Sequence, residues 1–348
     1  LHGTYKEGYK RQMDIYSWIM RRNGFNVSND CYFVYVNGDQ YFEEGMLLDD
    51  YDKAKMMFDV HLIKYVSDDS WVSKKKEISF WSAWIQLNQP ERLNGLTHSI
   101  KRDLVETITQ AQMDHRVRVL VFTGSGRAFS AGGDISGQNK PLSGEALMPP
   151  IPPGHDSEIG TYEGLRHLSQ TLNLAIRNCD KIAIAALNGV AIQTGMTMAL
   201  ACDFRVAATS AKLGSATLRF GLLPDEGGQY LCVQLMGVAR AMDFLINKKI
   251  VGADEALDLG LVHEVVDDES LEARVMEMAT EIANGPQVAI RLLKRSIYNA
   301  ADMTFEQSLD EIASKTAISD HHPDASEGAT AFREKRQPKF NAWLERYR

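Results

Sequence analysis

Two short, continuously apolar segments, RVLVFTG at 118–124 and KIAIAALNG at 181–189, most constrain what this chain can fold into. Each is uniformly apolar rather than alternating, as strands buried on both faces of a sheet are, and each runs into glycine. Helix-like stretches separate them from each other and from a third strand-like segment, ACDFRVAA at 201–208. Strands that alternate with helices predict an α/β fold with a largely parallel sheet covered by helices.

The rest of this body fits the same pattern. ISFWSAWIQL at 78–87 is strand-like and 99–113 is helix-like, whereas the Pro/Gly-rich insertion between Gln138 and Tyr162 is too irregular for an element. We expect that insertion to be a mobile lid or a disordered loop. Beyond Asp267 the chain is mostly helical, with a break at Asn284-Gly285-Pro286. We expect this helical tail to pack on a neighbouring subunit.

The N-terminal part has a different composition. It is aromatic-rich, with a helix-like stretch at 9–22 and an alternating strand, CYFVYV at 31–36, that we expect to close in a turn at Asn37-Gly38. The charged run from Lys74 to Glu77 marks the change. We therefore divide the chain into an accessory α/β segment at 1–74, a core at 75–268 and a C-terminal helical region at 269–348.

Composition excludes several classes of function. The net charge of −8 provides no positive field for nucleic acid, so no nucleic-acid partner is expected. No apolar run is long enough to cross a bilayer, and the first residues do not resemble a signal peptide, so we expect a cytoplasmic protein without a membrane partner. The four cysteines lie singly, without the spacing of a metal site, and no metal is predicted.

Two strand-to-turn junctions place small residues where backbone N–H groups could point into a cavity. They are FSAGGDIS at 129–136 and NGVAIQTGM at 188–196. Two amides converging from separate turns would form an oxyanion hole, which stabilises charge developing on a carbonyl oxygen. Each junction taken alone is equally consistent with an ordinary tight turn, because glycine commonly follows a strand for that reason.

Five motifs in order make the pattern specific. They are NQPERLNGL, GRAFSAGGDIS, IAALNGVAIQTGMTMALACDFRVA, AKLGSATLRFGLLPDEGG and ADEALDLGLVHEVV, followed by a closing FREKRQPKF. From about residue 78 to 340 the chain resembles the crotonase (enoyl-CoA hydratase/isomerase) superfamily. The resemblance implies a ββα spiral fold with a C-terminal helical trimerisation region, a homotrimer or hexamer, and an acyl-CoA thioester substrate. Coenzyme A would enter as part of the substrate, with no permanently bound cofactor.

The resemblance also implies site residues. The oxyanion amides would belong to Gly133 and Thr194, and the coenzyme A part of the substrate would lie along Ala131, Gly132, Asp134, Ile135 and Ser136. The second junction departs from the family pattern, because Gln193-Thr194-Gly195 replaces a run of glycines. An oxyanion hole needs an N–H rather than a particular side chain, so the substitution is tolerable, although it affects the local geometry.

The acidic residues distinguish between reactions. The two glutamates with which family hydratases activate water correspond here to Thr197 and Thr217, and threonine does not titrate near neutral pH. Family isomerases carry one carboxylate directly after the proline of the LLPDEGG segment, which is Asp225 here. We therefore expect an enoyl-CoA isomerase in which Asp225 is the base, its pKa raised by an apolar pocket, with Glu226 as the reserve candidate.

Other interpretations stay open at this point. Asp225 or Glu226 could cap the helix that follows, and the same hole could serve a hydratase or the hydrolytic or retro-Claisen cleavage of a β-dicarbonyl compound. A further alternative, from a different functional class, is a non-catalytic scaffold or a nucleic-acid-associated protein. Residues 1–72 weakly resemble the C-terminal portion of PD-(D/E)XK nuclease domains through Gln12, Tyr16 and the strand that follows. The metal-binding residues of such nucleases lie upstream of that helix, so this segment would be catalytically inactive.

Overall fold

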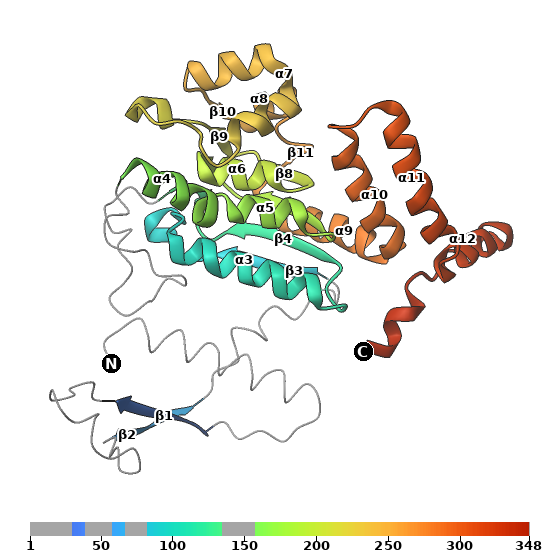
Figure 1. Ribbon diagram of the computed structural model, residues 1–348, viewed down its shortest axis with the longest axis horizontal. Helices are drawn as coiled ribbons and strands as arrows, with labels where there is room; N and C mark the ends of the chain where they lie inside the picture. The colour runs from blue at the N-terminus through green and yellow to red at the C-terminus, as the bar shows by residue number, and fades with distance from the viewer. Residues whose placement is uncertain (1–29, 39–57, 67–81, 134–156, 348) are drawn as a thin grey trace. The chain divides into compact units, whose positions relative to one another are not determined.

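The computed structural model of the protein describes residues 30–38, 58–66, 82–133 and 157–347, and the chain divides into two compact units, Leu1–Glu77 and Ile78–Arg348 (Figure 1). In the first unit, β1 (Asp30–Gly38) pairs antiparallel with β2 (Phe58–Val66). The predicted strand at 31–36 is confirmed. It continues through Gly38, however, so the turn expected at Asn37-Gly38 is wrong. The predicted helix at 9–22, with Gln12 and Tyr16, lies outside the described residues.

The second unit is built around a five-stranded sheet in the order β11-β8-β6-β4-β3, in which every neighbouring pair is parallel. Its strands are β3 (Ser82–Leu87), β4 (Val119–Gly124), β6 (Ile182–Leu187), β8 (Phe204–Ala208) and β11 (Glu264–Val266). The strands expected at 78–87, 118–124, 181–189 and 201–208 are therefore confirmed, with 78–81 outside the described residues. The parallel sheet is confirmed with them.

A second sheet has the order β10-β9-β7-β5. It contains β5 (Ala128–Ser130), β7 (Val190–Ile192), β9 (Lys212–Gly214) and β10 (Ile250–Gly252), of which β10 is antiparallel to β9 and the other pairs are parallel. Along the chain, β4, β6 and β8 of the first sheet are each followed directly by β5, β7 and β9 of the second. One or more helices then lead back to the first sheet. This repeated ββα unit is the predicted spiral.

Helices cover both faces of the five-stranded sheet (Figure 1). On one face, α9 (Leu271–Asn284) contributes Val275 to a buried core that also contains Val121 and Ile184. On the other, Phe122 and Leu187 belong to a core shared with α3 (His98–Met113), α5 (Thr171–Asn178) and α6 (Thr194–Ala201). Successive strand residues therefore meet apolar neighbours on opposite faces, which explains why the strands are continuously apolar.

The remaining helices of the described residues lie around this body and in a C-terminal arm. They are η1 (Pro90–Arg92), α4 (Glu158–Gly164), η2 (Leu165–Ser169), η3 (Thr217–Phe220), α7 (Gly228–Ile246), α8 (Ala253–Asp258), η4 (Asp268–Ser270), α10 (Gln287–Ala300), α11 (Phe305–Asp320), α12 (Pro323–Glu334) and η5 (Ala342–Tyr347). The helical tail is confirmed, and so is its break, because α9 ends at Asn284 and α10 begins at Gln287. Its packing on another subunit stays a prediction.

The predicted irregular insertion ends earlier in the chain than expected. The irregular insertion was expected to extend to Tyr162, but α4 begins at Glu158, where Ser157 accepts a hydrogen bond from the Gly160 N–H and so caps the helix. That end of the expectation is wrong, and 134–156 lies outside the described residues. Within the described ranges, no helix combines the length and the apolar character needed to cross a bilayer.

Candidate active site

The first junction is fixed by two asparagines. β4 ends at Gly124, where a methyl group would lie 2.1 Å from the Ala128 carbonyl oxygen, so the turn requires glycine. Asn94 Nδ2 donates to the carbonyl oxygens of Ser125 (3.0 Å) and Ala128 (2.7 Å). Asn188 Oδ1 accepts from the Gly124 N–H (3.0 Å). Neither asparagine has a role predicted from the sequence, although both lie in motifs that carry the family resemblance.

The two junctions converge because β5 and β7 are adjacent parallel strands. The segments that follow them, Gly132-Gly133 and Gln193-Thr194, consequently leave the sheet at the same edge. A methyl group on Gly132 would lie 2.8 Å from the Ile192 carbonyl oxygen, and one on Gly133 would lie 3.9 Å from Thr194 Oγ1. Gly133 and Thr194 are therefore neighbours. Thr194 also opens α6, so its N–H has no acceptor within the helix and lies at the positive end of the helix dipole.

Gln193 retains the backbone conformation that glycine would adopt. Its φ of 52° and ψ of −113° belong to a region that residues with a Cβ rarely occupy. The side chain is held in place by Ser215, whose hydroxyl donates to Gln193 Oε1 (2.9 Å). The main chain therefore follows the path that a glycine run would take, and Gln193 carries the backbone strain.

Close packing sets the position of α6 against β5. A methyl group at Gly195 would lie 2.2 Å from the Ser130 carbonyl oxygen, so the helix backbone rests directly on the strand. Ser130 Oγ donates to the Asn94 carbonyl oxygen (2.8 Å) and accepts from the Gly132 N–H (3.2 Å). The Gly132 N–H is therefore already hydrogen-bonded, and the next N–H along the segment is that of Gly133.

The acidic loop that precedes α7 packs on the same helix. A methyl group at Gly228 would come 2.9 Å from Thr197 Oγ1 on α6, which brings the start of α7 against the helix that Thr194 opens. Gln170 Nε2 donates to the Asp225 carbonyl oxygen (2.8 Å), and Asn173 Nδ2 donates to that of Glu226 (2.9 Å). Side chains from the η2–α5 region therefore hold the main chain of the loop.

The two neighbouring carboxylates lie in opposite environments. Glu226 is 9% exposed, and its Oε1 accepts from Lys101 Nζ (2.5 Å) on α3. Burial raises the pKa of the Glu226 carboxyl above its ordinary value, against the opposing effects of the Lys101 charge and hydrogen bond and of the Thr194 hydroxyl. Glu226 Oε2 is buried, and no residue in the described part of the chain forms a well-aligned hydrogen bond with it.

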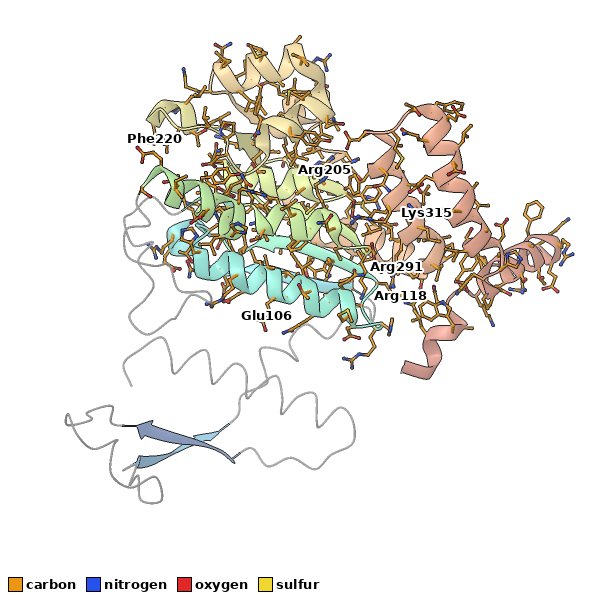
Figure 2. All side chains as sticks on the ribbon, viewed as in Figure 1. Glu106, Arg118, Arg205, Phe220, Arg291 and Lys315 are labelled. Atoms are coloured by element: carbon orange, nitrogen blue, oxygen red, sulfur yellow. The ribbon has the colours of Figure 1, made fainter. Side chains whose placement is uncertain are left out.

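Asp225, by contrast, is exposed and does not lie in the apolar pocket predicted for it from the sequence. Apolar side chains do precede it: Phe220, Leu222 and Leu223 are all more than half exposed, and Figure 2 shows Phe220 near the outer edge of the unit. The capping interpretation of the acidic pair is wrong. The N-cap of α7 is Gly227, and no side chain caps the helix.

The hydroxyl groups at the two positions that correspond to hydratase glutamates differ in their partners. Thr197 Oγ1 donates to the Gln193 carbonyl oxygen (3.1 Å) and thus serves α6 itself. Thr217 Oγ1 is buried, with no hydrogen-bond partner among the described residues. Neither group can accept a proton as a carboxylate does.

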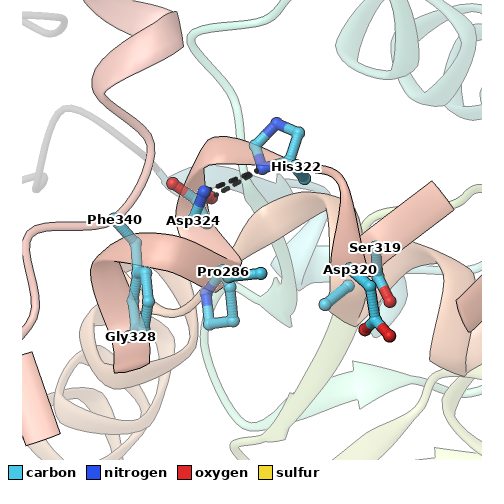
Figure 3. A pocket seen from close by; sticks show the side chains of 9 residues that line it. Pro286, Ser319, Asp320, His322, Asp324, Gly328 and Phe340 are labelled. Atoms are coloured by element: carbon cyan, nitrogen blue, oxygen red, sulfur yellow. Dashed lines mark hydrogen bonds and ion pairs between the residues drawn. The ribbon is translucent and has the colours of Figure 1, made fainter. Parts of the chain in front are cut away.

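A separate cavity lies among the C-terminal helices (Figure 3). It measures about 310 Å³ and is lined by Pro286, Ala289, Ser319, Asp320, His322, Asp324, Ala325, Gly328 and Phe340. Two of its lining residues have structural roles. Asp324 Oδ1 accepts from the Asn341 N–H (2.8 Å), and His322 caps α12. None of these residues belongs to the two junctions or the acidic loop, so this cavity is distinct from the candidate site.

Comparison with known proteins places this geometry in a family. The sequence pattern of the enoyl-CoA hydratase/isomerase family matches residues 82–149 and 153–343, more than half of the chain. The chain belongs to the enoyl-CoA hydratase/isomerase family. The family enzyme predicted from the motifs is thereby confirmed, and so is the crotonase-type fold. The isomerase assignment, the site residues and the nuclease resemblance of residues 1–72 stay predictions.

Individual relatives carry different names within the family. The chain is 33% identical over 256 residues to 1,2-epoxyphenylacetyl-CoA isomerase of Escherichia coli K12, covering 74% of this chain and 93% of the relative. It is 31% identical over 259 residues to crotonyl-CoA hydratase of Syntrophomonas wolfei, covering 74% and 94%. Among solved structures, the enoyl-CoA hydratase of Bacillus anthracis superposes with a TM-score of 0.68 at 30% identity and covers 76% of this chain and 96% of that one.

Of the site residues predicted from the sequence, the structure brings Gly132, Gly133 and Thr194 together and places Glu226 beside Thr194. Ala131 lies in the same segment, where its N–H donates to the Leu93 carbonyl oxygen (2.9 Å). Asp134, Ile135 and Ser136 lie outside the described residues. The predicted lining of coenzyme A by this segment is therefore untested.

Proposed function

We propose that this family member shifts the double bond of an enoyl-CoA thioester, from 3-enoyl to 2-enoyl, through an enolate held by the Gly133 and Thr194 amides. The observation that carries the proposal is the position of the acidic loop. Asp225 and Glu226 lie where α7 packs on α6, whereas threonine occupies both positions that correspond to hydratase glutamates. A single base suffices for isomerisation, whereas water addition needs an acid and a base.

In the proposed reaction a carboxylate removes a proton from the carbon next to the thioester carbonyl. Electrons from that C–H bond move toward the carbonyl, and the oxygen becomes negatively charged. Each amide donor stabilises this charge by roughly 3–4 kcal/mol. The same carboxylic acid then returns the proton at the γ carbon, and the double bond becomes conjugated with the thioester, so no atom is gained or lost.

We assign the base to Asp225 and keep Glu226 as the second candidate. Asp225 is accessible to a substrate, and the exposed apolar side chains of Phe220, Leu222 and Leu223 precede it, which suits an apolar acyl chain. Burial gives Glu226 the raised pKa expected of a base, but Lys101 occupies one of its oxygens. A base that carries a proton between two carbons needs to reach both.

The assay follows the ultraviolet absorbance of the conjugated thioester. With 3-enoyl-CoA as substrate we expect the absorbance to rise, and Asp225→Asn should lower kcat by about 10²- to 10⁴-fold, whereas Glu226→Gln should lower it less. The reverse order would assign the base to Glu226. Consumption of 2-enoyl-CoA with loss of absorbance would instead indicate a hydratase, and release of free coenzyme A from a β-dicarbonyl thioester would indicate cleavage. If CoA thioesters neither bind nor react, the scaffold interpretation holds.

A further inference from the structure

A buried ion pair connects two distant parts of the chain at the candidate site. Lys101 on α3 and Glu226 in the loop before α7 are separated by 125 positions, and their charged atoms Nζ and Oε1 are 2.5 Å apart. Their side chains are 7% and 8% exposed. At that depth neither charge is screened effectively by salt or water, so each acts on whatever lies beside it.

The group beside this pair is the second oxyanion residue. The Thr194 hydroxyl acts on the Glu226 carboxylate, and the same hydroxyl lies 3.9 Å from a methyl group placed on Gly133. The Glu226 carboxylate is therefore close to Thr194, whose amide is one of the two proposed oxyanion donors. An uncompensated negative charge at that place would oppose the negative charge that develops on the thioester oxygen.

We propose that Lys101 is a positioning residue of the thioester site: its ammonium group fixes and neutralises Glu226, so that the thioester oxygen becomes negative beside a neutral pair. This inference rests on the proposed oxyanion hole and adds the residue that prevents an uncompensated negative charge beside it. Lys101 does not touch the substrate, and its effect passes through Glu226.

Among the described residues, few groups face Glu226, which makes its response to pH interpretable. Lys101 approaches from α3, Thr194 from α6 and Asn173 from α5, while Asp225 belongs to the same loop. Of these, Lys101 favours the charged form of Glu226 and Asp225 disfavours it. Removing Lys101 therefore leaves burial and the Asp225 charge to oppose ionisation, and Glu226 then ionises at a higher pH than in the native protein.

The experiment measures polarisation of a bound thioester rather than turnover. Cinnamoyl-CoA is titrated into the full-length protein between about pH 6 and pH 9, and the red shift of its absorbance reports the pull of the hole on the carbonyl oxygen. The variants are Lys101→Met, Lys101→Arg and the pair Lys101→Met/Glu226→Gln. In Lys101→Met we expect the red shift to decrease as pH rises and the affinity for the probe to fall roughly tenfold, because Glu226 becomes charged with no cation beside it.

The controls separate electrostatics from folding. The double variant has no charge at either position and should show no such pH dependence, and Lys101→Arg should behave like the native protein. If Lys101→Met changes the red shift by the same factor at every pH, Lys101 has a structural role and the proposal is overturned. Should Lys101→Met not fold, Glu226→Gln alone decides: a red shift at least as large as the native one supports the proposal, and a smaller one overturns it.

The outcome is distinguishable from that of the proposed function. A native protein that polarises cinnamoyl-CoA but does not isomerise 3-enoyl-CoA refutes the isomerase and leaves the role of Lys101 intact. A native protein that binds the probe without any red shift, or does not bind it, refutes both.

Discussion

Gly195→Ala should reduce catalysis far more than it reduces stability. The added methyl group would lie 2.2 Å from the Ser130 carbonyl oxygen, 2.8 Å from Ser130 Cβ and 2.9 Å from Ser130 C, and two of these atoms belong to the backbone of β5. Because backbone cannot rotate away, α6 has to move by about 1 Å to reach ordinary contact distances. That movement shifts the Thr194 amide away from Gly133.

The magnitude follows from the two effects of the methyl group. Overpacking in a tight contact costs typically about 1–3 kcal/mol, and the better helix propensity of alanine returns about 0.5–1 kcal/mol, so the free energy of unfolding should fall by roughly 1–2 kcal/mol. Displacement or loss of one oxyanion donor lowers kcat by about 10²- to 10³-fold. The reaction should therefore slow by orders of magnitude in a protein that is still folded.

The assay pairs urea unfolding with the absorbance assay for 3-enoyl-CoA. Gly252→Ala is the matched control, since Gly252 has no atom within 4 Å of the position where a methyl group would be placed. It should leave both the unfolding free energy and kcat close to native values. A folded Gly195→Ala variant whose kcat stays within about threefold of native would show that the spacing of these two amides does not govern the reaction.

Two further predictions concern strain and ionisation. Gln193→Gly should be more stable than Gln193→Ala by about 1–3 kcal/mol in urea unfolding, because both variants lose the Ser215 hydrogen bond and glycine alone relieves the backbone strain; equal stabilities would mean that the conformation is unstrained. Burial lowers the pKa of Lys181 to about 8, so between that pH and its ordinary value the unfolded chain binds more protons than the folded one. The native protein should then gain stability relative to Lys181→Met as pH rises above about 8, and parallel curves for the two proteins would contradict this.

The strands, and the burial of both their faces, could be predicted from the sequence because the signals are local. Continuous apolar segments at 118–124 and 181–189 indicate strands covered on both faces, and the structure places α9 on one face and α3, α5 and α6 on the other. The irregular insertion was more difficult. Its composition gave no sign of the Ser157 cap that starts α4, since a single capping hydrogen bond has little effect on composition.

The candidate site was predictable in its main chain and less so in its side chains. Glycine and small residues after two strands pointed to Gly133 and Thr194, and strand pairing brought these residues together. Which carboxylate faces inward depends on how the loop between η3 and α7 is held, and the Gln170 and Asn173 hydrogen bonds that hold it come from more than 50 positions away. The opposite environments of the adjacent Asp225 and Glu226 could therefore not be predicted from the sequence.

The amino-acid sequence by itself determined the alternation of strands and helices, the family and the two glycine-bearing junctions, because each of these is encoded by residues that are close together in the chain. Only the tertiary structure decided that Lys101 meets Glu226, that Gln193 takes a glycine-like conformation and that Glu226 rather than Asp225 is buried. These features arise where α3, α6 and α7 come together. A contact between segments that are distant in sequence leaves no periodicity in a single chain, and its energy depends on burial that exists only after folding.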